Sequence, residues 1–286
     1  MTMKPLRDIH LQRSIHLSTV RVGCATLKTE TLTSLRNVGP KADNENDMDV
    51  KAAAAMCQYA YYKLNLGRSK KTKAELIDGW KPMTPFEVDM LMGSGFNPKL
   101  ENAISGFNSM LFQKQANGIR YFAYCTEGTD MKSVKDWFSN FSQGLIGLAP
   151  QYTYSVQMAK KIDNVIGNKA VLWFIGHSLG GGLASNNSLV TGRHAITFNA
   201  AGLNPLRVHA TLILNNGEDL FHPIERTQRI HAFVLEGEIL NSLLGWIGQS
   251  AYGSRKPIKI GNQKDKNTFQ RHALTTLLDK WKMKHD

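Results

Sequence analysis

VLWFIGHSLGGGLAS, residues 171–185, is the stretch that decides the fold of this 286-residue chain. It opens with an almost continuous apolar run of strand length, as expected of a parallel strand buried on both faces. A G-x-S-x-G motif follows at once, and the segment 180–189, rich in small residues, is predicted to be a helix. Strand, sharp turn and helix in this order favour a nucleophilic serine over a mere glycine-rich corner.

Each residue type in this motif has a physical reason. Ser178 is expected on a strained turn that projects its hydroxyl above the edge of the sheet. Gly176 and Gly180 leave room for neighbouring chain that any Cβ would obstruct. Three further small residues let the helix pack closely on the sheet: Gly181, Gly182 and Ala184.

The rest of the chain alternates strands with helices. Asp47 or Asp49 is predicted to cap a buried helix over 50–65, and a loop region is predicted over 68–98. The predicted strands are 119–125, 170–176, 194–202, 229–237 and 256–261, and the further predicted helices are 99–115, 131–143, 151–166 and 271–281. This alternation indicates an α/β fold with a mostly parallel central sheet flanked by helices.

The ends and the cysteines constrain the class of protein. Residues 1–50 are predicted to be an N-terminal extension, partly disordered or loosely packed, and 51–286 the α/β domain. No signal peptide is recognisable, and no apolar stretch reaches the roughly 18 residues of a transmembrane helix. The three cysteines form neither a disulfide framework nor a metal-binding pattern, so no metal and no cofactor are expected.

A serine nucleophile requires a base, and in this arrangement the chain order is serine, acid, histidine. Six histidines follow the motif: His194, His209, His222, His231, His272 and His285. Of these, His272 follows the last predicted strand and opens the last predicted helix, where a loop can bring it over Ser178. We predict that His272 is the base.

The acid is expected after the strand 229–237. Glu236 and Glu238 are both candidates, because strand alternation puts them on the same side. Glu238 lies past the turn at Gly237 and can leave the strand edge, so we prefer it. Asp219, in the turn NNGEDL, is the rival.

An oxyanion intermediate needs two hydrogen-bond donors. One is the backbone N–H of Leu179, the residue after the nucleophile. The other is expected in the loop TEGTD after the strand 119–125, where Gly128 permits close approach and Thr129 offers a backbone N–H and a hydroxyl.

Taken together, TEGTD, the pair Asp136-Trp137, VLWFIGHSLGG and TFNAAG resemble the class 3 lipases. That family includes fungal triglyceride lipases and bacterial relatives called phospholipases, some exported as type VI secretion effectors. The resemblance covers about residues 100–280 and implies the α/β-hydrolase fold. Family members have arginine where this chain has Glu127. They commonly have Gly-Asp where it has Gly237-Glu238, which supports Glu238 as the acid, and His272 matches their terminal histidine.

The resemblance implies hydrolysis of a lipid ester, with Ser178 attacking the acyl carbonyl, His272 moving the proton and Glu238 holding the imidazolium. It also implies a mobile lid, for which residues 137–150 are the candidate. A lipase or phospholipase, secreted as an antibacterial toxin, is the first hypothesis. A small-ester hydrolase and a non-catalytic lipid- or partner-binding descendant are the alternatives.

The net positive charge of the chain indicates what kind of surface or molecule it binds. The formal net charge is +12, and residues 254–286 carry nine Lys/Arg against three acids. An anionic phospholipid surface suits this excess, and no nucleic-acid-reading motif accompanies it. We expect a lipid substrate at a membrane surface, no nucleic acid, and an immunity or secretion protein as a further partner. Export without a cleavable signal peptide is expected, with a cytoplasmic location as the alternative.

Overall fold

The computed structural model describes residues 48–64, 76, 78–93, 101–102, 107–127, 149–203, 223–244, 251–259 and 266–282. All of them belong to the second of the two units into which the chain divides, Gly39–Asp286. The extension 1–50 lies almost wholly outside the described residues, as do the helix 131–143 and nearly all of the candidate lid. The domain boundary near residue 50 therefore stays a prediction.

A mostly parallel sheet runs through this unit, in the order β1-β3-β4-β5-β6-β7-β8 with β2 paired to β3. The strands are β1 (Lys81–Pro82), β2 (Glu101–Asn102), β3 (Phe107–Ala116), β4 (Ile119–Thr126), β5 (Val171–His177), β6 (His194–Phe198), β7 (Ile230–Leu235) and β8 (Ser254–Ile258). Strands β4 to β8 are parallel, whereas β3 pairs with its neighbours antiparallel. The predicted α/β fold is confirmed, and its arrangement is that of the α/β-hydrolases.

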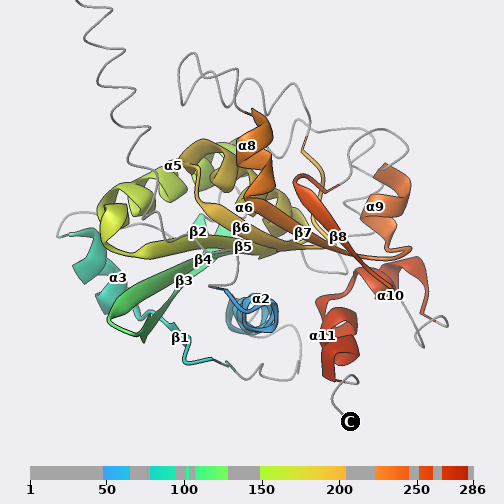
Figure 1. Ribbon diagram of the computed structural model, residues 1–286, viewed down its shortest axis with the longest axis horizontal. Coiled ribbons are helices and arrows are strands. Elements are labelled where there is room, and N and C mark those ends of the chain that lie inside the picture. Colours follow the sequence, from blue (N-terminus) through green and yellow to red (C-terminus); the bar gives the residue numbers. More distant parts are fainter. Residues whose placement is uncertain are drawn as a thin grey trace, which may run out of the picture. The chain divides into compact units, whose positions relative to one another are not determined.

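Helices cover both faces of this sheet (Figure 1). They are α2 (Val50–Leu64), α3 (Pro85–Met92), α5 (Ala149–Ile166), the short 3-10 helix η1 (Gly167–Lys169), α6 (Leu179–Thr191), α8 (Pro223–Gln228), α9 (Ile239–Leu244), α10 (Thr268–His272) and α11 (Leu274–Lys282). Helices α5 and α6 pack on one face, and α2 and α11 on the other. No helix among the described residues is long and apolar enough to span a membrane.

Strand β5 is apolar at nearly every position because both of its faces are covered. Leu172 and Phe174 pack into the core cluster beneath α5 and α6, whereas Trp173 and Ile175 pack into the cluster beneath α2. Each of these side chains is at most 2% exposed, and burying one contributes about 1.5–3 kcal/mol. The central strand that carries the motif is thereby fixed in depth and register.

The helix predicted over 99–115 is wrong, because this stretch contains β2 and most of β3. Burial alternates along Phe107–Leu111, which is the period of a strand. Asn117 and Gly118, with φ of 51° and 76°, then join β3 to β4. Asn-Gly between apolar runs is the sequence signal of such a hairpin turn, and it marks the error in the helix prediction.

The loop region predicted over 68–98 contains helix α3. The Thr84 hydroxyl accepts the backbone N–H of Glu87 (3.2 Å), and the Glu87 carboxylate accepts that of Thr84 (2.7 Å). With Pro85 as the first helical residue, T-P-F-E is the signature of a helix start. The other predicted helix start is confirmed, since the Asp49 carboxylate caps α2.

Candidate active site

Ser178 lies on the turn between β5 and α6. Its backbone has φ 59° and ψ −127°, a left-handed conformation that residues with a side chain rarely adopt. Its N–H donates to the carbonyl of Phe198 (3.1 Å), and its carbonyl accepts from the N–H of Ala201 (2.9 Å). The strained turn that the motif predicts is therefore confirmed, and β6 and the loop after it hold it in place.

The glycines of the motif are required by backbone contacts. A Cβ on Gly176 would lie 2.3 Å from the carbonyl oxygen of Gly180, inside the turn itself. A Cβ on Gly180 would lie 2.2 Å from the carbonyl oxygen of Thr126. The end of β4, from which the predicted oxyanion loop departs, thus lies directly against the first turn of α6.

His272 reaches Ser178 from near the C-terminal end of the sequence. Its Nε2 lies 2.9 Å from Ser178 Oγ, within the reach that a general base needs, and both side chains are buried. The predicted helix 271–281 is wrong at its start, because His272 ends α10 and α11 begins two residues later. Ala273 between them is extended, so His272 lies at a break between helices.

Asn199 explains this break. Its side-chain amide donates to the carbonyls of Arg271 (3.1 Å) and His272 (3.0 Å), and its Oδ1 accepts the N–H of Leu235 (2.8 Å). The carbonyls of Arg271 and His272 therefore accept from Asn199 and not from the N–H groups of a continuing helix. Asn199 follows β6 and bonds β7, so it attaches His272 to both strands. Asn199 has a φ of 42°, which asparagine tolerates better than most residues.

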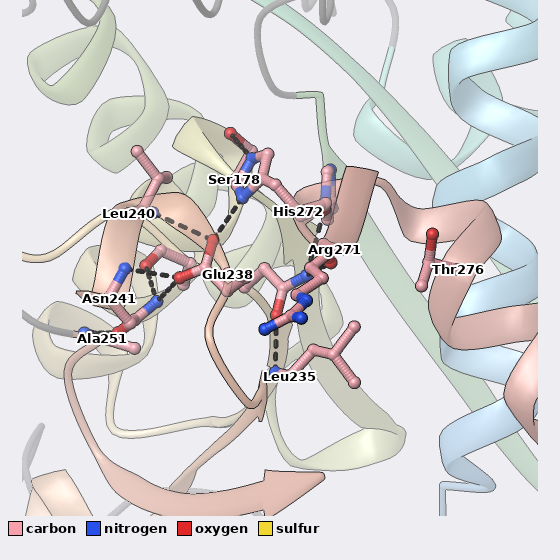
Figure 2. A network of polar contacts seen from close by, with 12 residues as sticks. Ser178, Leu235, Glu238, Leu240, Asn241, Ala251, Arg271, His272 and Thr276 are labelled. Atoms are coloured by element: carbon pink, nitrogen blue, oxygen red, sulfur yellow. Dashed lines mark hydrogen bonds and ion pairs between the residues drawn. The ribbon is translucent and has the colours of Figure 1, made fainter. Parts of the chain in front are cut away.

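Glu238 is the carboxylate that the structure brings to His272. Its Oε2 lies 2.6 Å from His272 Nδ1, and both side chains are fully buried (Figure 2). A carboxylate accepts the Nδ1 proton, which leaves Nε2 free to accept the Ser178 hydroxyl proton. Glu236 is exposed, so the expectation that Glu236 and Glu238 share one side is wrong. Gly237, at φ 71°, turns the chain between them.

The Glu238 carboxylate also caps helix α9. Its Oε2 accepts the N–H of Leu240 (3.0 Å) and its Oε1 that of Asn241 (2.5 Å), at the second and third positions of the helix. An acidic oxygen on these donors is the usual N-terminal cap. The longer side chain of glutamate lets one residue cap its own helix and hold the histidine.

Asn241 is a residue of the site that sequence reasoning missed. Its amide nitrogen donates to Glu238 Oε1 (2.5 Å), and its Oδ1 accepts the N–H of Ala251 (2.7 Å), as Figure 2 shows. It therefore ties the carboxylate to the segment that enters β8. The signal E-x-x-N at a helix start is too common for the sequence alone to have found it.

Of the remaining predicted site residues, one is among the described residues and two are not. Leu179 is the first residue of α6, so its N–H has no carbonyl of that helix to donate to. Thr129 and Asp219 lie outside the described residues. The oxyanion role of Thr129 stays a prediction, and Asp219 is not needed for the hydrogen-bond chain that Glu238 completes.

The geometry suits nucleophilic catalysis. A buried hydroxyl, an imidazole and a carboxylate stand in hydrogen-bonded sequence, with a helix N-terminus beside the hydroxyl. Within the part of the chain that the structure describes, no three His, Cys, Asp or Glu side chains gather as a metal site would require.

Comparison with known protein families agrees with a site for nucleophilic catalysis. The sequence model of a domain described as phospholipase-like, the Tle-like phospholipase domain, matches residues 25–260. The chain belongs to the Tle-like phospholipase family. This membership confirms the resemblance to bacterial phospholipases of the lipase class.

Individual relatives are more distant or shorter matches. The extracellular phospholipase A1 of Serratia liquefaciens is 38% identical over 115 residues, which is 40% of this chain and 34% of the relative. The chain thus matches about a third of that protein's length. A hyperthermophilic esterase from the archaeon Pyrobaculum calidifontis aligns with 90% of this chain and 97% of its own, at 14% identity and a TM-score of 0.25. That score is too low to bear on the fold.

Proposed function

We propose that this protein is a serine hydrolase that cleaves a carboxylic ester of a phospholipid. The observation that supports this most strongly is the continuous hydrogen-bond chain from Ser178 through His272 to Glu238. Membership of the Tle-like phospholipase family supports a phospholipid as the substrate class.

In the proposed reaction, His272 takes the proton of Ser178 as Oγ attacks the acyl carbonyl carbon. The resulting tetrahedral oxyanion is stabilised by the Leu179 N–H and by a donor from the loop at Thr129. His272 then gives its proton to the leaving alcohol, and an acyl-enzyme remains on Ser178. Water activated by His272 releases the fatty acid and restores the serine, while Glu238 stabilises each imidazolium that forms.

The proposal extends to where the protein acts. We propose that the protein is exported without a cleavable signal peptide; the name of the extracellular relative from Serratia supports export and does not bear on the route. An antibacterial toxin that degrades phospholipid would damage the cell that makes it, so a protective immunity protein or a secretion protein is the further partner we propose. The lipid surface itself is the site of peripheral binding.

The test of the catalytic proposal is Ser178→Ala. A serine hydrolase should lose on the order of a million-fold in turnover of a phospholipid, and a fluorophosphonate probe should no longer label the protein. Ser185→Ala, on the same helix and equally buried, is the matched control and should keep both activities.

Each other outcome selects an alternative. Failure of the probe to label folded wild-type protein would mean a non-catalytic, lipid-binding descendant of the fold. Labelling at Ser178 with hydrolysis of short soluble esters but no phospholipid would mean a small-ester hydrolase. Mass analysis of the products from one defined phospholipid identifies the acyl position that is cleaved.

A further inference from the structure

His177, the residue between Gly176 and the nucleophile, has a polar role that the motif does not require. It is the last residue of β5 and is 4% exposed. Its ring lies beside the ring of His272, with the centroids 5.0 Å apart and the planes tilted by 40°. A second imidazole is thus packed against the proposed base.

The contact between these two histidines has a definite direction. His177 Nε2 lies 2.8 Å from the main-chain carbonyl oxygen of His272. A carbonyl oxygen can only accept, so the proton of His177 must be on Nε2. The same carbonyl also accepts from Asn199. Two donors, from the ends of β5 and β6, therefore fix the backbone of His272 where its side chain meets Ser178.

A third residue sets the protonation of His177. The Tyr61 hydroxyl, on α2, lies 3.0 Å from His177 Nδ1, and the two rings meet edge to face at 5.7 Å. With the proton on Nε2, Nδ1 of the neutral ring is an acceptor, so Tyr61 donates to it. The tyrosine hydrogen bond favours the one tautomer that can hold the His272 carbonyl.

We propose that His177 is a positioning residue for the base: its Nε2–H holds the His272 main chain, and Tyr61 selects the tautomer that makes this possible. His177 bonds the main chain of His272, and Tyr61 bonds His177, so both act through His272. The inference rests on the proposed hydrolase function, and it adds helix α2, far upstream of the motif, to the parts of the chain that set the reaction rate.

The test measures kcat and KM on a soluble short-chain ester, together with the rate of fluorophosphonate labelling. His177→Phe keeps an aromatic ring, slightly larger than imidazole, and removes the donor, so kcat and the labelling rate should fall about tenfold or more with KM unchanged. His177→Gln carries an N–H at nearly the same reach as Nε2 and should restore most of the loss. Tyr61→Phe should lower kcat about threefold.

His231→Gln is the matched control. His231 is equally buried, at 4%, and lies near the start of β7, whereas His177 is the last residue of β5. This control should lower thermal stability without changing kcat. An unchanged kcat in folded His177→Phe would overturn the inference, as would a loss in His177→Gln equal to that in His177→Phe. An equal loss of kcat in His231→Gln would do the same.

Two further results keep the test decisive. If His177→Phe does not fold, Tyr61→Phe decides alone, because it removes one hydroxyl and an unchanged kcat would refute the tautomer role. If wild-type protein is not labelled by the probe, the proposed hydrolase function fails. If the wild type is labelled and the variants match it, only the positioning role fails.

Discussion

At the scale of single residues, Glu238 combines two tasks that are usually separate. It accepts the Nδ1 proton of His272, and it caps α9 through the N–H groups of Leu240 and Asn241. The catalytic geometry and the start of a helix therefore depend on one carboxylate. A change in its length or charge should affect both reactivity and stability.

Glu238→Gln keeps the length and removes the charge, so kcat should fall by about 10⁴-fold, as expected when the histidine loses its ionic partner. Glu238→Asp keeps the charge, but a side chain one methylene shorter cannot reach His272 while it caps α9. Its kcat should fall less, on the order of tenfold, with a lower melting temperature.

Ester turnover and thermal unfolding measure these two effects separately. The matched control is Glu236→Gln, because Glu236 lies two residues away and is exposed. It should turn over like the wild type. A larger loss in Glu236→Gln than in Glu238→Gln would assign the acid to Glu236 instead.

The residues that sequence reasoning found and missed differ in a physical way. Ser178 and Glu238 follow strands and lie beside glycines, so local pattern indicates them. Asn199, Asn241 and Tyr61 act through side-chain hydrogen bonds to partners that are distant along the chain or ordinary in type. No periodicity or turn signal marks an amide or hydroxyl of that kind.

At the scale of elements, helix α2 is held against the sheet by contacts that can be probed chemically. Cys57 on α2 and Cys125 on β4 are both buried, with their sulfur atoms 3.8 Å apart. Burial raises the pKa of the Cys125 thiol well above its usual range. Less thiolate is then present at neutral pH, and the thiolate is the reactive form.

We expect neither of these thiols to react with a thiol reagent at pH 7.5 while the protein is folded, and both to react in denaturant. Counting modified thiols by mass, in a Cys24→Ser background, makes the measurement specific to the pair. As the pH is raised, the reaction of Cys125 should remain slow past the ordinary titration range of cysteine, because its raised pKa delays thiolate formation. Rapid labelling of either residue in native protein would contradict a tightly docked α2.

Two of the errors at this scale, over 99–115 and 68–98, have a common origin. The stretch 99–115 contains amides and lysines that suit a helix, and 68–98 contains glycines and prolines that suit a loop. In both places a two- to four-residue signal outweighs composition: Asn117-Gly118 for the hairpin and Thr84 to Glu87 for α3. The core strands were predictable because burial on both faces leaves little choice of residue.

At the scale of the whole molecule, positive charge accumulates at one edge of the sheet. β8 is the last strand of the sheet and pairs with β7. Its basic residues Arg255 and Lys256 are exposed, as is Lys259, which follows the strand. Each basic residue near an anionic lipid surface contributes about 1 kcal/mol to binding. This edge is therefore where we expect the protein to meet its substrate surface.

Replacing these three residues with glutamate should weaken binding to phosphatidylglycerol vesicles by about a hundredfold or more, and turnover of a soluble ester should not change. Wild-type binding should itself weaken as salt is raised, because exposed charges are screened. Co-sedimentation at two salt concentrations measures both effects.

Lys81, Lys161 and Lys169 are exposed lysines on other elements, β1, α5 and η1. The same replacement at these three positions is the control for net charge. If the control weakens vesicle binding as much as the β8 variant does, the total charge binds the lipid and no particular edge is responsible.

The left-handed backbone at Ser178 also has an evolutionary consequence. A serine at φ 59° costs the fold about 1–2 kcal/mol, and glycine would relieve nearly all of it. In a descendant that no longer used the hydroxyl, mutation to glycine would be favoured by stability. A serine is therefore expected at this position only where selection favours its hydroxyl over stability.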